Sequence, residues 1–275
     1  MLAAERRSRI LAQLGRDGTV RVRDLVVDLG VSDMTIRRDL GVLQEQGALE
    51  KVHGGATASG GPTTAEPGFE AKSTQQLAQK EAIARRAAEL VTPGSAIAVS
   101  AGTTTYALAR HLVAIPHLTV VTNSVWVADI LHRSGNTTLS VLLTGGLRTP
   151  SDALVGPLAI SALRSLHLDT VFLGVHGMDV RGGFSTPNLL EAETNRAMIA
   201  SGRRLVVVAD ATKWGLVGLS SMAALEEASV LVTDTGLAPR ARQQLAEILD
   251  EVVLVDPIRP GEVQARPKGS DGTHD

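Results

Sequence analysis

Two adjacent arginines, Arg37 and Arg38, lie in a stretch whose apolar residues recur at the spacing of one helical face. With those apolar residues turned toward a core, Met34 and Arg38 point outward and are flanked by Thr35 and Arg37. Arginine can form two hydrogen bonds to a guanine edge, and threonine can reach bases or phosphates. The pattern favours a helix that enters the major groove of duplex DNA, although paired arginines taken alone are more often a solvated face.

The elements expected before this helix support a DNA-binding interpretation. Residues 10–14 and 22–29 predict two short amphipathic helices. Gly30 then supplies a turn, and Ser32 is a good N-cap for the arginine-bearing helix and a further candidate DNA contact. Two helices that precede a third with a polar, cationic face are typical of a helix-turn-helix module.

A short strand with a glycine turn is expected after the arginine-bearing helix, over residues 48–56, as in a β-wing. Lys51, His53 and Gly54 of this wing are candidates for contacts to phosphates. None of the six aromatic residues of the chain lies within residues 1–57, so stacking on unpaired bases is not expected. The partner of this module should therefore be duplex DNA.

A second set of polar residues follows the first strand-like run of the C-terminal part. The run ends at Ser100, and Gly102, Thr103, Thr104 and Thr105 open a predicted helix. Free backbone N–H groups at a helix start, with hydroxyls nearby and a glycine that permits close approach, are suited to bind a phosphate group. The alternative, that the threonines only cap the helix, is about equally open at this point.

Apolar runs that alternate with helical patterns predict a mostly parallel sheet covered on both faces, an α/β architecture. These runs cover residues 96–100, 118–122, 139–144, 170–175, 205–209, 230–233 and 252–255. Ligands of such sheets bind beyond the carboxyl ends of the strands. Polar or flexible residues at those ends are candidate ligand contacts, each of them weak alone: Asn123, Gly145, Gly146, His176, Gly177, Asp179, Asp210 and Lys213.

Some of these candidates have simpler interpretations. The glycines could be ordinary turns, and Asp210 with Lys213 could be a surface ion pair. The predicted helix over residues 189–201 places Glu191 and Asn195 one turn apart on one face, while Glu193 points elsewhere and could pair with a nearby arginine. Glu193 is nevertheless kept among the candidate ligand contacts.

At 275 residues the chain is long enough for two domains. A segment rich in Gly, Pro, Ser and Thr separates them. We expect a DNA-binding domain over residues 1–57, a linker over 58–69, an α/β ligand-binding domain over 70–258 and a flexible tail over 259–275.

Composition excludes several classes of site. The chain has no cysteine, which excludes disulfides and thiolate metal sites, and no second histidine stands at metal-ligand spacing from His176. We expect no metal and no cofactor. No apolar run approaches the ~20 residues of a membrane helix, so we expect a cytoplasmic protein that has no membrane partner.

The N-terminal module resembles a known DNA-binding signature. The sequence VSDMTIRRDL at residues 31–40, followed by VHGGA at residues 52–56, resembles the winged helix-turn-helix of the DeoR family of transcription regulators. The resemblance implies that Arg37 and Arg38 contact DNA, that Thr35 assists, and that the His-Gly-Gly wing grips the DNA backbone.

The C-terminal part resembles the DeoR-family sensor domain from about residue 69 to residue 256, and that domain is similar in fold to ribose-5-phosphate isomerase. The matching segments include KEAIA at 80–84, GTT at 102–104, TN at 122–123, GG at 145–146, EAE at 191–193 and DATK at 210–213. The resemblance implies that the Gly-Thr-Thr loop holds the phosphate of a sugar-metabolism intermediate, with Lys213 nearby. Two positions depart from the family pattern: Ser100, where Asp is common, and Asn195, where Lys is common.

These features predict a regulator. Its expected partners are double-stranded operator DNA, a phosphorylated sugar or related metabolite, and further copies of the chain in a dimer or tetramer. Repression of sugar-metabolism genes, relieved by the ligand, is the expected mode. One alternative is an isomerase of sugar phosphates with Glu193 as base, which the departures at Ser100 and Asn195 disfavour. A second alternative keeps the DNA-binding module but makes the C-terminal domain only an assembly platform.

Overall fold

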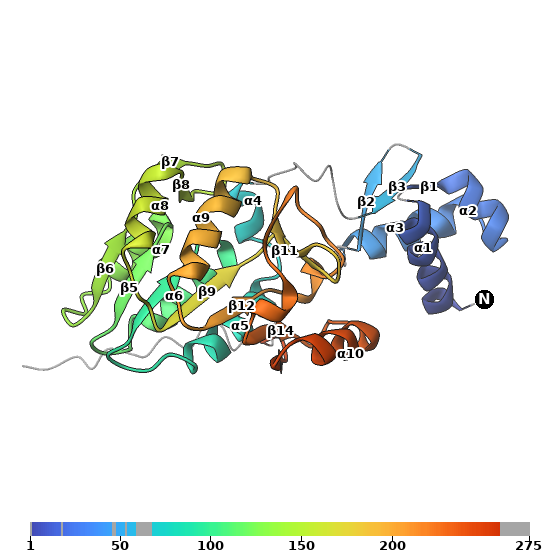
Figure 1. Ribbon diagram of the computed structural model, residues 1–275. Coiled ribbons are helices and arrows are strands. Elements are labelled where there is room, and N and C mark those ends of the chain that lie inside the picture. The colour runs from blue at the N-terminus through green and yellow to red at the C-terminus, as the bar shows by residue number, and fades with distance from the viewer. Residues whose placement is uncertain (1, 18, 46–47, 53, 59–67, 259–275) are drawn as a thin grey trace, which may run out of the picture.

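The computed structural model describes residues 2–17, 19–45, 48–52, 54–58 and 68–258. The tail expected over 259–275, most of the expected linker and His53 lie outside the described residues. The N-terminal module is built of three helices and a small antiparallel sheet in the order β1-β3-β2 (Figure 1). Its elements are α1 (Ala3–Asp17), β1 (Thr19–Arg21), α2 (Val22–Leu29), α3 (Asp33–Glu45), β2 (Leu49–Val52) and β3 (Gly55–Ala58).

The apolar stripes of the three helices meet in one small core. Ile10, Leu25, Ile36 and Leu40 are among its fully buried members. Gly30 ends α2 in the left-handed region, with φ of 62°, a conformation that glycine adopts at no steric cost. The expected helix-turn-helix with a wing is therefore present, and α3 is the arginine-bearing helix.

The C-terminal part is a doubly covered parallel sheet, as expected. Seven strands lie in the order β15-β14-β12-β9-β4-β5-β6, and all neighbouring pairs are parallel. The strands are β4 (Ala96–Val99), β5 (Thr119–Thr122), β6 (Ser140–Leu143), β9 (Thr170–Gly174), β12 (Leu205–Val208), β14 (Val230–Asp234) and β15 (Glu251–Val255). Each of them falls within or overlaps one of the predicted apolar runs.

Helices cover both faces of this sheet (Figure 1). Side chains of β4 alternate, since Ile97 and Val99 join one apolar cluster and Ala98 joins the other. The first cluster is completed by α5 (Leu77–Ala88), α6 (Thr103–Leu112) and α7 (Val125–His132), and the second by α8 (Pro157–Arg164), α9 (Leu189–Ala200) and α10 (Pro239–Ile248). Burial on both sides explains why the strands are almost continuously apolar.

The chain leaves β4 toward β5 and β6, and then returns to place β9 on the other side of β4. The carboxyl ends of β4 and β9 therefore form a switch point, where open α/β sheets hold their ligands. A short helix, α4 (Phe69–Ser73), precedes α5 and packs near this end of the sheet.

Several short elements were not predicted from the sequence. They are β7 (Leu147–Arg148), β8 (Leu154–Val155), β10 (Gly177–Asp179), β11 (Gly183–Thr186), β13 (Ser220–Ala223) and the 3₁₀ turns η1 (Ala211–Lys213) and η2 (Leu225–Glu227). The strands β10, β11 and β13 form a second, small sheet. Within the described ranges, no helix is both long and apolar enough to cross a membrane.

Candidate functional site

The outer face of α3 is open to solvent. Met34 is 80% exposed, Arg37 and Arg38 are exposed, and Thr35 is half-buried. Ser32 caps the helix as expected, because its hydroxyl accepts a hydrogen bond from the Thr35 backbone N–H at 3.3 Å. The predicted outward residues of this helix thus share a surface that could approach another molecule.

The two arginines differ in their surroundings. Arg37 forms an ion pair with Asp33 one turn earlier, and this hydrogen bond raises the pKa of Arg37 above its ordinary value. Arg38 forms no ion pair with any described residue. Its charge is therefore the more available of the two for a phosphate or a guanine edge.

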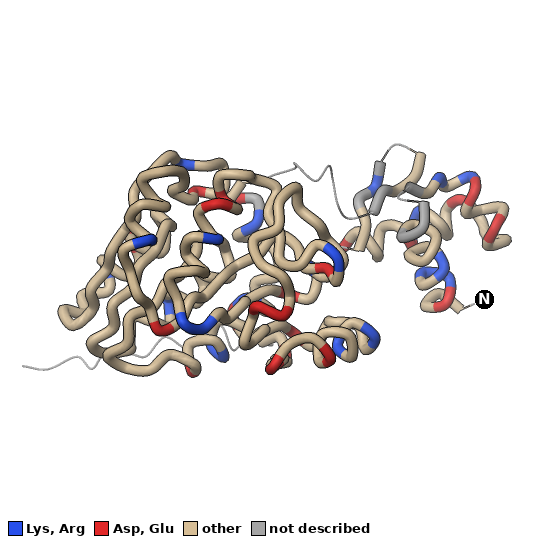
Figure 2. The backbone as a smooth tube through the Cα atoms, viewed as in Figure 1, with Lys and Arg blue, Asp and Glu red and all other residues tan. Residues whose placement is uncertain are grey.

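A hollow of about 450 Å³ lies beside this face, between α1 and α3. It is lined by Ser32, Met34, Thr35 and Arg38 from the predicted set. Arg6 and Arg7 of α1 also line the hollow, and no sequence pattern indicated these two residues. Figure 2 shows both basic and acidic residues along the helices of the N-terminal module, so the module as a whole is not uniformly basic.

A buried carboxylate holds α3 in place against α1. Asp39 is 5% exposed and accepts a hydrogen bond from the Arg6 guanidinium. Because Asp39 follows Arg38 directly, this pair fixes the rotation of α3 that turns Arg38 outward.

The wing is shaped by two adjacent glycines with different constraints. Gly54 has φ of 82°, and a Cβ there would meet nothing within 4 Å. A Cβ on Gly55 would lie 2.1 Å from the backbone oxygen of Val20, because β3 runs tightly against β1. Lys51 is exposed, and its Nζ lies 4.0 Å from the position of a Cβ on Gly41 of α3. The wing lysine is thus close to the surface of α3.

A small pocket lies at the switch point of the parallel sheet. Its walls come from the segments after β4, β9 and β12, and from α4, α9, β11 and β13. Its volume is about 70 Å³, well below the roughly 300–1,000 Å³ of typical ligand sites. The lining residues are Lys72, Ala101, Gly102, Thr103, Thr104, Ser151, Gly174, Val175, His176, Thr186, Glu191, Asn195, Lys213 and Met222.

The Gly-Thr-Thr loop forms the start of α6 at this pocket. Gly102, with φ of 152° and ψ of 161°, adopts a conformation that is essentially restricted to glycine. The N-cap position is Gly102, and no side-chain hydrogen bond caps the helix there. The alternative in which the threonines only cap the helix is therefore not supported. The first backbone N–H groups of α6 therefore border the pocket, which suits an anion.

Three lysines converge near this loop. Lys72 and Lys213 line the pocket, and the Lys80 ammonium behind them donates a hydrogen bond to the Lys72 carbonyl at 2.6 Å. Burial lowers the pKa of Lys80 to about 8, with Asp210 opposing the shift and Lys213 and Lys72 adding to it. Lysines that repel one another around a small space favour an anionic occupant.

The helix α9 contributes an acidic side chain and an amide to the pocket. The Glu191 carboxylate is buried and accepts hydrogen bonds from the hydroxyls of Thr149 at 2.7 Å and Thr186 at 3.1 Å. Asn195, one turn later, also lines the pocket. The prediction that these two share a face of the helix, with Glu193 turned elsewhere, is confirmed.

Five of the predicted ligand contacts are brought together in this pocket: Gly102, Thr103, Thr104, His176 and Lys213. Others support its walls without lining it. Ser100 is fully buried, and its hydroxyl accepts a hydrogen bond from the Gly174 N–H at 2.9 Å. The Thr105 hydroxyl donates to the Gly102 carbonyl at 3.0 Å.

Asn123 and Asp210 also have structural partners. Asn123 accepts a hydrogen bond from the Ala101 N–H at 2.9 Å and donates to the Leu154 carbonyl at 3.2 Å. Asp210 is buried and caps η1, which rules out the surface ion pair considered from the sequence.

The predicted glycines and Asp179 have structural roles in the local backbone. Gly145 has φ of 74° in a turn. A Cβ on Gly146 would lie 2.4 Å from the Val155 oxygen, and one on Gly177 would lie 2.1 Å from the Leu216 oxygen. Asp179 accepts hydrogen bonds from two backbone N–H groups of the following turn. None of these four residues lines the pocket.

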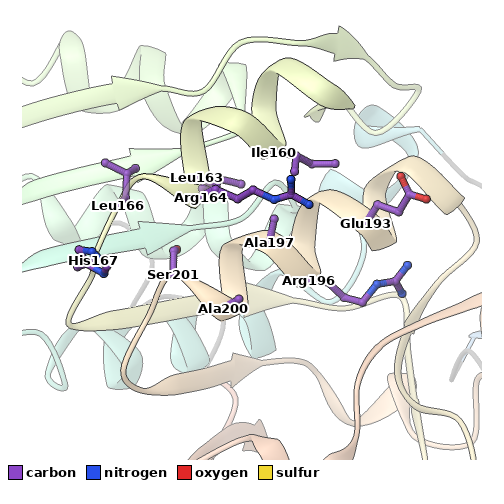
Figure 3. Close-up of a pocket in the computed structure, with 10 residues that line it drawn as sticks. All are labelled: Ile160, Leu163, Arg164, Leu166, His167, Glu193, Arg196, Ala197, Ala200 and Ser201. Atoms are coloured by element: carbon purple, nitrogen blue, oxygen red, sulfur yellow. The ribbon is translucent and has the colours of Figure 1, made fainter.

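Glu193 lies on the other side of α9, in a separate and more open groove of about 620 Å³ between α8 and α9. Figure 3 shows Glu193 and Arg196 extending from α9 and Arg164 extending from α8. Glu193 is thus not placed with the other candidate ligand contacts, and it cannot act as a base on a molecule held at the Gly-Thr-Thr loop.

Four residues of the pocket lining were not predicted from sequence: Lys72, Ser151, Thr186 and Met222. Lys72 and Ser151 do not follow a predicted strand, so no pattern indicated them. Thr186 and Met222 lie on strands that are too short to predict. Among the described residues, no group of three or more histidine or carboxylate side chains is placed to hold a metal ion.

Comparisons with known proteins agree with both halves of this description. Residues 6–59 match the DeoR-like helix-turn-helix domain, and residues 75–235 match the DeoR C terminal sensor domain. A relative from Escherichia coli (strain K12), the uncharacterized HTH-type transcriptional regulator YgbI, is 40% identical over 90% of this chain and 96% of its own length. The putative aga operon transcriptional repressor of Escherichia coli O157:H7 is 35% identical over 92% of this chain and 94% of its own.

A third relative, the lactose phosphotransferase system repressor of Staphylococcus aureus (strain N315), is 34% identical over 84% of this chain and 91% of its own length. Among solved structures, ribose 5 phosphate isomerase A from Neisseria gonorrhoeae has a TM-score of 0.37 and 14% identity over 52% of this chain and 55% of its own, which is too distant to carry an argument. All three sequence relatives are named as regulators or repressors, in agreement with the expectation of a regulator rather than an enzyme. The chain belongs to the DeoR family of transcription regulators, with a DeoR-like helix-turn-helix domain followed by a DeoR C-terminal sensor domain.

Proposed function

We propose that this chain represses genes of sugar metabolism and that a small phosphorylated sugar modulates its binding to operator DNA. Residues 1–57 read the DNA, residues 70–258 bind the sugar, and residues 58–69 join the two. The observation that carries the proposal is the exposed face of α3, where Arg38 points to solvent without an ion pair to any described residue.

The DNA-binding part rests on the shape and charge of α3 and the wing. A helix of this kind presents its amino-terminal half to base edges in the major groove, and a wing lysine such as Lys51 contacts phosphates. Arg38 is the candidate for a guanine contact. Arg37, which forms an ion pair with Asp33, contributes more to the general electrostatic attraction to the DNA phosphates.

The ligand part rests on the pocket at the switch point. The N–H groups at the start of α6 and the lysines at positions 72, 80 and 213 suit a phosphate group. The small volume argues against a nucleotide or dinucleotide as the ligand. Sugar metabolism is suggested by the names of two relatives, the aga operon repressor and the lactose phosphotransferase system repressor.

A direct route from the pocket toward the DNA-binding module is offered by α4. This helix is the first described element after residue 67, and it contributes Lys72 to the pocket. Phe69 of the same helix stacks on Trp126 at a ring-centre distance of 5.4 Å and meets Tyr106 edge-on at 5.6 Å. A ligand that draws on Lys72 would shift α4 and, through the linker, the arrangement of paired DNA-reading modules in a homo-oligomer.

The experiment is a gel shift with DNA from upstream of the chain's own coding sequence, repeated with a panel of phosphorylated sugars. Arg38→Ala should abolish specific binding, Arg37→Ala should weaken it less, and both variants should bind the sugar phosphate as the wild type does. Thr103→Ala should bind DNA normally and lose the response to the ligand. Equal loss of DNA and ligand binding in Arg38→Ala, or no wild-type binding to duplex DNA, would overturn the proposal.

A further inference from the structure

The hollow of about 450 Å³ between α1 and α3 borders one flank of the exposed face of α3. Helical spacing places Thr35 and Gly41 on opposite sides of Arg38, each about 60° around the helix axis from it. Thr35 lines the hollow, whereas Gly41 lies beside the wing lysine, Lys51. The exposed face of α3 therefore has the hollow on one side and the wing on the other.

Three arginines line this hollow, and one of them already has a partner. Arg6 pairs with the buried carboxylate of Asp39 and so ties α1 to α3. Arg7 and Arg38 form no ion pair with any described residue. Arg7 donates from Nε to the Ala3 carbonyl at 3.3 Å, which uses one of the five N–H donors of its guanidinium. The α1 side of the hollow thus carries a positive charge that no carboxylate neutralises.

Two hydroxyls lie at the same place. Ser32 and Thr35 both line the hollow, and their hydroxyl oxygens lie 2.9 Å apart in one shared hydrogen bond. Whichever of the two donates, the proton of the other hydroxyl is not used in this bond. A guanidinium together with a hydroxyl donor is a common set of groups around a DNA phosphate.

The dimensions of DNA give each flank of α3 a partner. The major groove is about 12 Å wide, close to the 10–12 Å diameter of a helix with its side chains. A helix that enters this groove therefore has a phosphate backbone near each of its flanks. If Lys51 of the wing meets one backbone, the hollow that contains Arg7 faces the other.

We propose that the hollow between α1 and α3 binds a phosphate of the DNA backbone, which Arg7 holds together with the hydroxyl pair of Ser32 and Thr35. Arg6, its neighbour in sequence, takes no part, because Asp39 engages it. This inference rests on the proposed function, since it requires that α3 enters the major groove. It assigns to Arg7 a contact that is independent of the base sequence.

The test is the salt dependence of DNA binding by the full-length chain, measured by fluorescence anisotropy. Two duplexes of equal length are compared, one from upstream of the chain's own coding sequence and one scrambled. Each phosphate contact contributes about 0.9 to the slope of the logarithm of the binding constant against the logarithm of salt concentration. Arg7→Gln should reduce this slope by about 0.9 for each bound module and weaken binding to both duplexes by a similar factor. The advantage of the wild type should therefore shrink about threefold to fourfold per module from about 50 to about 200 mM salt.

Arg9→Gln is the matched control. Arg9 lies on the same helix, is exposed, pairs with Glu5 at 3.1 Å and does not line the hollow, so this variant should keep the wild-type slope. Arg7→Lys retains the charge and should also keep the slope. Arg6→Gln leaves the carboxylate of Asp39 buried without its partner and should lower the temperature of thermal unfolding, whereas Arg7→Gln should unfold as the wild type does.

An Arg7→Gln slope equal to that of Arg9→Gln would overturn the inference. An effect confined to the upstream DNA would also overturn it, because that result would indicate base reading. A fall in unfolding temperature as large as that of Arg6→Gln would assign Arg7 to packing and overturn it too. The scrambled duplex separates this inference from the proposed function: a wild type that binds both duplexes equally refutes specific reading, while the slope of Arg7→Gln still decides the role of Arg7. A wild type that binds neither duplex refutes both.

Discussion

The glycine at the start of α6 allows the anion-binding role of this loop to be tested by a single methyl group. Gly102 has φ of 152° and ψ of 161°, and a Cβ there would lie 3.1 Å from the Thr105 hydroxyl oxygen. Holding alanine in this region costs roughly 1–3 kcal/mol. For a domain of this size, each 1 kcal/mol lowers the midpoint of thermal unfolding by about 2–4 °C, so Gly102→Ala should lower it by roughly 2–12 °C.

The same substitution should also impair anion binding, because any relaxation of the strain turns the N–H groups at the start of α6. A hydrogen bond to a charged group is worth about 1.5–3 kcal/mol, so the loss of one weakens phosphate affinity about tenfold or more. Gly94→Ala is the matched control. Gly94 has φ of 80° and lies in a turn before β4, where a Cβ would meet nothing within 4 Å.

The control should lose stability, by about 1–2 kcal/mol, and keep its affinity for phosphate. Thermal unfolding and calorimetric titration with inorganic phosphate measure the two effects separately. If Gly102→Ala binds phosphate as tightly as Gly94→Ala does, the loop is not the anion site and the reasoning is refuted.

The remaining predictions concern charge, backbone space and helix capping. Because the pKa of ligand-free Lys80 is about 8, its attraction for an anion should fade as the pH rises through 8, and calorimetry on either side of that pH should show affinity falling in the wild type and not in Lys80→Met. Gly55→Ala should separate the wing from its neighbouring strand and abolish DNA binding in a gel shift, whereas Gly54→Ala, which has free space, should cost only about 1–2 kcal/mol in denaturant unfolding. Ser32→Ala should lower stability by about 0.5–2 kcal/mol in the same denaturant assay, and an unchanged value would show that its hydroxyl does not cap α3.

The parallel sheet was predictable from sequence because its strands are buried on both faces. Runs such as 170–175 and 205–209 are apolar without alternation, and helical patterns separate them, which together leave few other architectures. The small sheet of β10, β11 and β13 was not predictable, because its strands are short and rich in Gly and Ser. Its pairing is set by tertiary contacts rather than by a local pattern.

Residues of the candidate site were predictable only where they come directly after a predicted strand or share one face of a predicted helix. Gly102 and Lys213 were found in this way, and helical spacing separated Glu191 from Glu193. Gly177, in contrast, looks like a flexible ligand contact in sequence and is a close backbone approach in the structure. Lys72 could not be found, because α4 reaches the pocket from a part of the chain remote from any strand.

The central claim is that the exposed face of α3 reads base edges in the major groove. Methylation interference on the bound operator tests it most directly, because a methyl group on guanine N7 occupies the atom to which an arginine would donate. The account predicts guanines whose methylation blocks binding of the wild type. The weak non-specific binding that Arg38→Ala retains should be insensitive to methylation at these guanines. Wild-type binding that is insensitive to methylation at every guanine N7 would contradict it.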